Sequence, residues 1–220
     1  MIKLSKETFF DLERRLKDAG LDSDSESFDV IKKRLLSPEM PSADEFARQA
    51  IYVILAGGFS QKTAKKIHAK VMDYIAANPV PKFDDIIKFL NNKNKMNAII
   101  KVWENRQKYR DGYYALAGSD LESKLSYLSS LPHIGKITAN HLARNLGEDI
   151  VKYDIWIQRL GVAFVGREDL KSKIDNGNLD PDVKAACDEM FAHLVRETGL
   201  PRGYIDVVLW KSCQVGLIKL

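Results

Sequence analysis

The chain has 220 residues and a formal net charge of +4, and 45% of its residues are hydrophobic, which suffices for one core or for two closely packed halves. No stretch approaches the ~20 apolar residues of a membrane span and the first residues lack a signal peptide's apolar region, so we exclude a membrane protein. We expect a cytoplasmic, nucleoid-associated protein, or a nuclear one in a eukaryote; the small positive excess permits a polyanionic partner without requiring it.

Apolar residues recur with helical spacing along almost the whole chain, and we find no convincing strand. The first predicted helices begin after Ser5, lie within 23–36, run from Ser42 to Gly57, and restart at Ser60 to close before Pro79. The later ones cover 83–90, 96–116 with an interruption at Gly112, 121–128, the residues from Thr138 onward, 155–160, 182–197 and 204–215. The helix after Ser42 is apolar on most sides, so we expect it to be central.

The two cysteines, Cys187 and Cys213, limit the metal chemistry of the chain. Neither belongs to a CxxC pair, which excludes a zinc site or a four-cysteine iron–sulfur cluster within this chain. Their spacing leaves a disulfide open, and two buried thiols are the simpler expectation for a cytosolic protein.

Residues 131–135, LPHIG, form a short turn between two predicted helices. Proline and glycine suit such a tight connection, so residues 121–147 are predicted to form a helix-hairpin-helix. The first N–H groups of the following helix have no partner within it and mark the positive end of its dipole, which makes this end a phosphate-binding site. Lys136 adds a positive charge there. The alternative is a plain turn between two helices.

Asp154 follows Gly135 by 19 residues (154 − 135) and lies among apolar residues in VKYDIWIQRLG. An aspartate in this position is either the N-cap of a helix that begins at Ile155 or a working carboxylate. The two interpretations are compatible, because a capping residue can also face a cleft.

Taken together, LPxIGxxTA, a following helix that ends in glycine, and DxxIxRLG resemble the helix-hairpin-helix DNA glycosylase superfamily, which includes endonuclease III and the 8-oxoguanine glycosylases. The matching residues are Leu131, Pro132, Gly135, Thr138, Ala139, Gly147, Asp154 and Arg159. Weaker matches are residues 59–63 with the family's SQQT segment, 93–100 with its NxKAxxI stretch and 206–210 with its closing helix, so the resemblance spans about residues 40–215.

The resemblance implies an all-α fold of two helical subdomains with a cleft between them. We expect residues 41–150 to form a central helical subdomain with the hairpin at 121–147. Residues 1–40 would pack with the C-terminal helices, and residues 151–220 would complete this second subdomain.

The resemblance also implies a DNA glycosylase of base excision repair, which flips a damaged or modified base out of double-stranded DNA and hydrolyses its N-glycosidic bond. Asp154 would be the catalytic carboxylate. The residues expected to hold the DNA backbone are Pro132, His133, Gly135, Lys136 and Thr138. We expect a monomer with no cofactor and no metal bound by side chains, apart from a monovalent cation held by backbone carbonyls of the hairpin.

The sequence departs from the family at two positions. Bifunctional members carry a lysine two residues after the hairpin glycine, where this chain has Ile137; Lys136 comes one residue earlier, which turns its side chain by about 100° on a helix. We therefore expect a monofunctional enzyme, with a lyase lysine such as Lys136 left open. Trp156 stands where the family has a small or polar residue, and it either joins the core or walls a base pocket.

Residues at the start of the helix after Ser60 have two interpretations. Gln61 either inserts into the duplex or lines the base pocket, or it is a solvated helix-start residue. Lys62, Lys65 and Lys66 either contact phosphates or form a solvated face.

Three other functions stay open at this point: an enzyme of the same fold that modifies DNA bases, a non-enzymatic helix-hairpin-helix DNA-binding module, and a helical protein-interaction domain. No sequence feature identifies which base would be removed.

Overall fold

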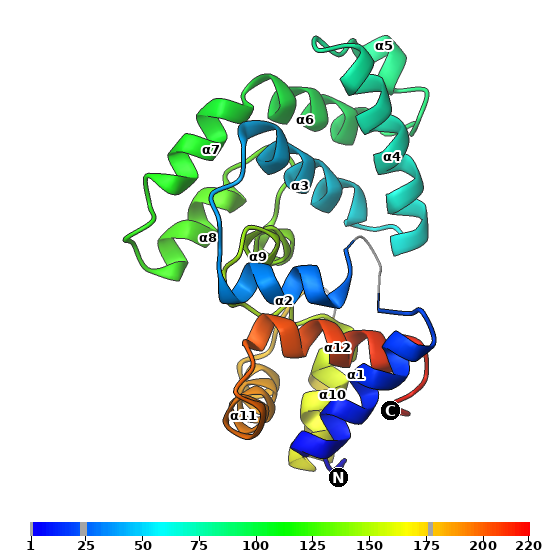
Figure 1. Cartoon of the computed structure of the whole chain (residues 1–220), viewed down its shortest axis with the longest axis vertical. Helices are drawn as coiled ribbons and strands as arrows, with labels where there is room; N and C mark the ends of the chain where they lie inside the picture. The colour runs from blue at the N-terminus through cyan, green and yellow to red at the C-terminus, as the bar shows by residue number, and fades with distance from the viewer. Residues whose placement is uncertain (1, 23–25, 176–177) are drawn as a thin grey trace. The chain divides into compact units, whose positions relative to one another are not determined.

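The computed structural model describes residues 2–22, 26–175 and 178–220, and within these ranges the chain is helical and contains no strand (Figure 1). This confirms the predicted all-α fold. The chain divides into two compact units: unit 1 combines Met1–Ser37 with Glu148–Leu220, and unit 2 is Pro38–Gly147. None of the helices in the described ranges combines the length and the apolar character needed to cross a membrane.

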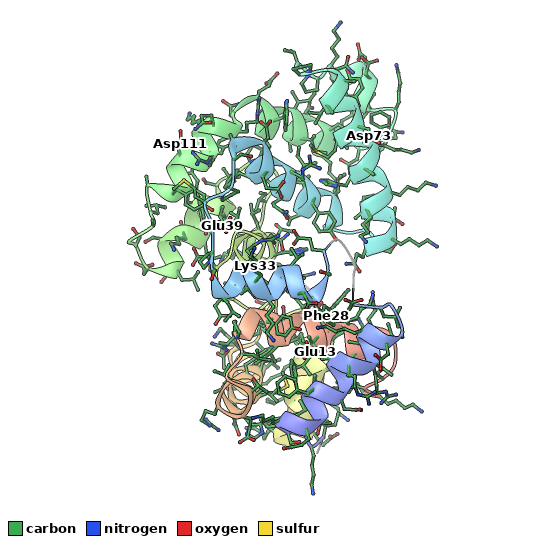
Figure 2. The ribbon with its side chains drawn as sticks, in the orientation of Figure 1. Glu13, Phe28, Lys33, Glu39, Asp73 and Asp111 are labelled. Atoms are coloured by element: carbon green, nitrogen blue, oxygen red, sulfur yellow. The ribbon has the colours of Figure 1, made fainter. Side chains whose placement is uncertain are left out.

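Unit 1 is built from the helices at the two ends of the chain. They are α1 (Lys6–Asp18), α2 (Phe28–Leu36), α10 (Ile155–Val165), the 3-10 helix η1 (Glu168–Lys173), α11 (Pro181–Thr198) and α12 (Arg202–Gln214). Helix α12 is the centre of this unit, because nearly all of its residues are buried. Tyr204 on α12 makes an edge-to-face contact with Phe28 of α2 and donates a hydrogen bond to Glu13 of α1, so both N-terminal helices are anchored on it. Figure 2 labels Phe28 and Glu13 on these two helices.

The cysteines of unit 1 are buried thiols, as expected. Burial raises the pKa of both Cys187 and Cys213 to about 12, which keeps them protonated and inert at neutral pH. Cys187 of α11 also lies close to Gly161 of α10, where a Cβ on Gly161 would come within 2.8 Å of the Cys187 Cα.

Unit 2 is built around α3. Its helices are α3 (Ala43–Ala56), α4 (Gln61–Ala77), α5 (Phe83–Ile86), α6 (Lys93–Glu104), α7 (Arg106–Tyr114), α8 (Leu121–Ser129) and α9 (Lys136–Asn145). Helix α3 packs against α4, α6, α7 and α9 and is buried on most sides, which confirms that it is central (Figure 1). Ser42 and Ser60 cap α3 and α4 through their side chains, as their positions before the helices predict.

Two predicted helix boundaries in unit 2 are wrong. The segment 96–116 is interrupted at Asn105 and not at Gly112. The Asn105 side chain and its backbone N–H both donate to the Lys101 carbonyl at this point. Gly112 stays helical, and its missing Cβ leaves room for the Tyr127 hydroxyl of α8. The helix expected over 83–90 ends at Ile86 and continues as turns.

Candidate active site

The predicted hairpin is present in unit 2, between the end of α8 and the start of α9. Leu131 and Ile134 are both 4% exposed, and the N–H of Ile134 donates to the Leu131 carbonyl at 3.2 Å. The two apolar side chains therefore anchor a closed turn, while Pro132 is half-buried between them. The polar residues of the hairpin, His133 and Lys136, are left exposed.

Gly135 is the N-cap of α9, and its backbone makes two hydrogen bonds with the Thr138 hydroxyl, one as donor and one as acceptor. Its N–H donates to Thr138 Oγ1 at 2.8 Å, and that hydroxyl donates to the Gly135 carbonyl at 3.0 Å. A glycine has no side chain to cap the amides of the first turn, so within the described part of the chain the N–H groups of residues 136–138 have no intrahelical partner. A Cβ built on Gly135 would meet nothing within 4 Å, so the helix start is open to an approaching anion.

His133 has a backbone conformation that the sequence did not reveal. Its φ is +59°, in the left-handed region that costs a non-glycine residue about 1 kcal/mol, and such strain is often found at functional sites. Partial burial lowers the pKa of His133, and the nearby Lys95 ammonium lowers it further. The imidazole is therefore mainly neutral at pH 7 and would meet a phosphate through a hydrogen bond rather than as a cation.

Lys95 of α6 is a buried cation that sequence reasoning matched only to the NxKAxxI pattern. It is 5% exposed, and its Nζ donates to the carbonyls of Ile54, at 2.8 Å, and of Gly57. The ammonium also lies 4.7 Å from the Phe59 ring centroid. Desolvation lowers the pKa of Lys95, and its charge offsets the negative end of the α3 dipole. It thereby fixes the turn that leads from α3 into α4.

Gln61, the residue expected at a base pocket or duplex gap, is the first residue of α4 and is partly exposed. Lys62 and Lys66 on the same helix are exposed, and Lys65 is partly exposed. These side chains belong to unit 2 together with the hairpin, and their contact with DNA stays a prediction.

Asp154 lies in unit 1 and caps α10. Its Oδ1 accepts hydrogen bonds from the backbone N–H groups of Trp156, at 3.0 Å, and of Ile157, at 3.2 Å. The predicted N-cap role is thus confirmed. The side chain is also partly exposed rather than packed into the core, as a carboxylate that works on a ligand must be.

Trp156 packs, partly buried, against the hydrophobic core of unit 1. Its ring lies 5.6 Å from the guanidinium of Arg159, one turn along α10, in a cation–π contact. The structure thus supports the core interpretation of Trp156, and a second role as a pocket wall stays a prediction.

The hairpin carbonyls are the donors expected to hold a monovalent cation. Two of them are already engaged, because the Leu131 oxygen accepts from Ile134 and the Gly135 oxygen accepts from Ala139 and Thr138. The remaining neutral carbonyl oxygens of residues 132–134 are ligands of the type that such a cation takes. Within the described ranges, no group of three or more histidine, cysteine, aspartate and glutamate side chains is placed to hold a metal ion.

Comparison with known proteins gives no match to any protein-family model and no significant match to a curated protein. Solved structures do match. The 8-oxoguanine glycosylase/lyase of Methanocaldococcus jannaschii, in complex with a 15mer DNA containing 8-oxoguanine, has a TM-score of 0.63 at 17% identity over 95% of this chain and 98% of that one. The 8-oxoguanine DNA glycosylase of Thermotoga maritima has a TM-score of 0.61 at 18% identity over 93% of this chain and 94% of that one. The chain therefore has the all-α fold of these 8-oxoguanine DNA glycosylases.

Proposed function

We propose that this chain is a DNA glycosylase that removes a modified base from duplex DNA, with Asp154 as its catalytic carboxylate. The observation that carries the proposal is the placement of Asp154: a partly exposed carboxylate, fixed at the start of α10, that follows the hairpin glycine in a chain with a glycosylase fold. The fold alone does not define an activity, so the proposal depends on this residue.

The chemistry asked of Asp154 is electrostatic. As the N-glycosidic bond breaks, positive charge develops on the deoxyribose, and a carboxylate beside it stabilises that charge or directs a water to it. Two backbone N–H groups hold Oδ1, so the carboxylate is oriented before the substrate arrives. A fixed charge of this kind needs no reorganisation at the moment of reaction.

The hairpin supplies the grip on the DNA backbone. Nothing lies within 4 Å of a Cβ placed on Gly135 at the start of α9, and Lys136 adds a positive charge at the same helix end. A monovalent cation on the hairpin carbonyls is part of the proposal, and it would add positive charge close to the bound phosphate.

We take 8-oxoguanine as the first base to test, because the solved structures with this fold are named for that base. We further propose hydrolysis without lyase chemistry, because Ile137 occupies the position of the family's nucleophilic lysine. Borohydride trapping of a covalent complex between the protein and substrate DNA would contradict this second part and leave the first intact.

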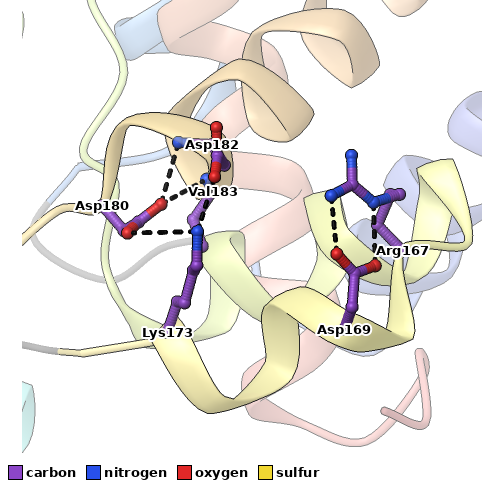
Figure 3. A network of polar contacts seen from close by, with 6 residues as sticks. All are labelled: Arg167, Asp169, Lys173, Asp180, Asp182 and Val183. Atoms are coloured by element: carbon purple, nitrogen blue, oxygen red, sulfur yellow. Dashed lines mark hydrogen bonds and ion pairs between the residues drawn. The ribbon is translucent and has the colours of Figure 1, made fainter.

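The decisive experiment compares Asp154→Asn with Asp180→Asn. Asp180 is the matched control, since it caps α11 in the same unit and accepts from the N–H groups of Asp182 and Val183 (Figure 3). The assay measures single-turnover release of 8-oxoguanine through the strand scission that alkali then induces. We expect Asp154→Asn to lose at least about a hundredfold in rate and to retain DNA binding, whereas Asp180→Asn stays at the wild-type rate.

Two results would contradict the proposal. An Asp154→Asn variant that excises the base at the wild-type rate removes Asp154 from the chemistry. A wild-type protein that binds DNA but releases no base from any of a panel of modified duplexes would identify a DNA-binding module instead.

A further inference from the structure

Tyr153, the residue before Asp154, has a side-chain contact that the mechanism above does not use. Its hydroxyl donates to Asp188 Oδ1 of α11 at 2.5 Å. The N–H of Asp154 donates to the Lys152 carbonyl at 2.7 Å, which closes a three-residue turn centred on Tyr153. The position of the Tyr153 ring therefore affects the orientation of Asp154, the last residue of this turn.

Asp188 is itself fixed by two cations. Its Oδ2 lies 2.6 Å from Lys184 Nζ and its Oδ1 lies 2.5 Å from Arg202 Nη2. Burial alone would raise the pKa of Asp188, but the bonds from Lys184, Tyr153 and Arg202 outweigh it and lower the pKa. Burial and the adjacent Asp188 raise the pKa of Tyr153, so a neutral phenol donates to a carboxylate at any working pH.

The backbone around Tyr153 is held by two further buried groups. Asp206 Oδ2 accepts from the N–H of Lys152 at 3.2 Å, and Gln158 Nε2 donates to the Tyr153 carbonyl at 2.9 Å. Both Asp206 and Gln158 are only 1% exposed. The main chain is thus fixed on each side of the turn. The Tyr153 side chain is held as well, because its hydroxyl binds Asp188 and its ring packs against the core, with the ring centroid 5.2 Å from Lys184 Nζ.

We propose that Tyr153 and Asp188 are positioning residues that aim the Asp154 carboxylate at the reacting sugar. The proposal rests on the proposed function and assigns no contact with DNA to either residue. A cluster that only stabilises unit 1 would have the same hydrogen bonds, so the test must separate catalytic rate from stability.

Tyr153→Phe removes the hydroxyl and keeps the ring. The matched control is Tyr204→Phe in the same unit, which removes a hydroxyl that also donates to a carboxylate, that of Glu13. We expect Tyr153→Phe to slow single-turnover excision of 8-oxoguanine by about tenfold to a hundredfold, because a displaced catalytic group loses rate steeply. Its Kd for a duplex with a stable abasic analogue should stay within about twofold of wild type. Tyr204→Phe should lower Tm and leave the rate unchanged.

The amide resonances of Trp156 and Ile157 provide a second measurement, since both N–H groups donate to Asp154. They should shift in Tyr153→Phe and stay in place in Tyr204→Phe. The inference is overturned if Tyr153→Phe excises at the wild-type rate, if the two variants lose rate equally, or if the rate falls with both resonances unmoved. A wild-type protein with no base release is a different result, which overturns the proposed function and this inference with it.

Discussion

The Asp154 carboxylate and the backbone N–H of Trp156 lie 3.0 Å apart, so the residue proposed for catalysis also begins a helix. The two roles need different properties of the side chain. Capping needs only an oxygen that accepts hydrogen bonds, which asparagine also provides, whereas stabilising a cationic sugar needs the negative charge.

We therefore predict that stability and activity separate at position 154. Asp154→Ala should lower the free energy of unfolding by about 1 kcal/mol, and Asp154→Asn should change it by less than about 0.5 kcal/mol. Both should lose base excision. Urea unfolding beside the excision assay measures this, and equal destabilisation by Asn and Ala would show that the cap depends on charge rather than on an acceptor.

Gly135→Ala should weaken DNA binding with only a small effect on stability. The φ of Gly135 is −93° and its Cβ would meet nothing within 4 Å, so alanine fits the free protein. The same methyl group would occupy the space through which a phosphate approaches the α9 amides. We expect a Kd for duplex DNA raised about tenfold, with at most about 1 kcal/mol lost in the free energy of unfolding because alanine is a poorer N-cap than glycine.

The contrasting variant is Gly161→Ala, whose Cβ would overlap the backbone of Cys187. It should lower the free energy of unfolding by about 2 kcal/mol or more. A Gly135→Ala variant that binds DNA as wild type does would exclude close approach at the hairpin.

Some features could be predicted from the sequence because a local rule determines them. Ser42, Ser60 and Asp154 were correctly predicted to begin helices, since a capping side chain acts on amides within three residues of it. The hairpin was predicted for the same reason, because Pro132 and Gly135 mark it locally.

Other features depend on residues far apart in the sequence. The burial of Lys95 follows from carbonyls of α3 about forty positions away, and the helical Gly112 follows from its contact with Tyr127 of α8. The link between Tyr153 and Asp188 joins residues 35 positions apart. Neither spacing nor residue type reveals such contacts, so the groups that hold Lys95 and Tyr153 were missed, although the helix cap at Asp154 was predicted.

Lys95→Met should destabilise unit 2. Methionine fills a similar volume but donates nothing, which leaves the carbonyls of Ile54 and Gly57 at the buried end of α3 without the ammonium. We expect a loss of about 1–3 kcal/mol in the free energy of unfolding. Lys93→Met on the same helix is the exposed control and should have little effect. Equal stability of the two variants would mean that removing a buried charge offsets the lost hydrogen bonds.

Ile137→Lys should add lyase chemistry to the proposed hydrolytic activity. Ile137 is 41% exposed at the start of α9, so a lysine fits there without disturbing the core. Its amine would stand two residues after Gly135, at the position that the resemblance assigns to the nucleophile. Borohydride should then trap a covalent complex with 8-oxoguanine DNA for the variant and not for wild type. Trapping with wild type as well would assign the amine to another lysine.

The stability of the protein should fall as the pH is lowered from 7.5 to 5.5, mainly through His68. Burial lowers the pKa of His68 below its usual 6.5, and the Arg48 charge lowers it further. The hydrogen bond between His68 Nε2 and the Arg48 carbonyl, 3.2 Å apart, acts in the opposite direction but does not cancel the shift. The unfolded chain therefore binds a proton near pH 6.5 that the folded chain binds only at lower pH. Stability is then complete above pH 6.5 and decreases below it, by at most about 1.4 kcal/mol per pH unit for one histidine.

His68→Gln tests this assignment, since a glutamine amide can donate to the Arg48 carbonyl without titrating. Thermal unfolding across the same pH range should show a flatter profile for this variant. His133, whose pKa is also lowered, is exposed, so solvent reduces its contribution and His133→Gln should leave the slope nearly unchanged. Aspartates and glutamates titrate below about pH 5.5 unless their pKa is raised, so they contribute little to this slope. An unchanged slope in His68→Gln would therefore mean that a group other than this histidine takes up the proton on unfolding.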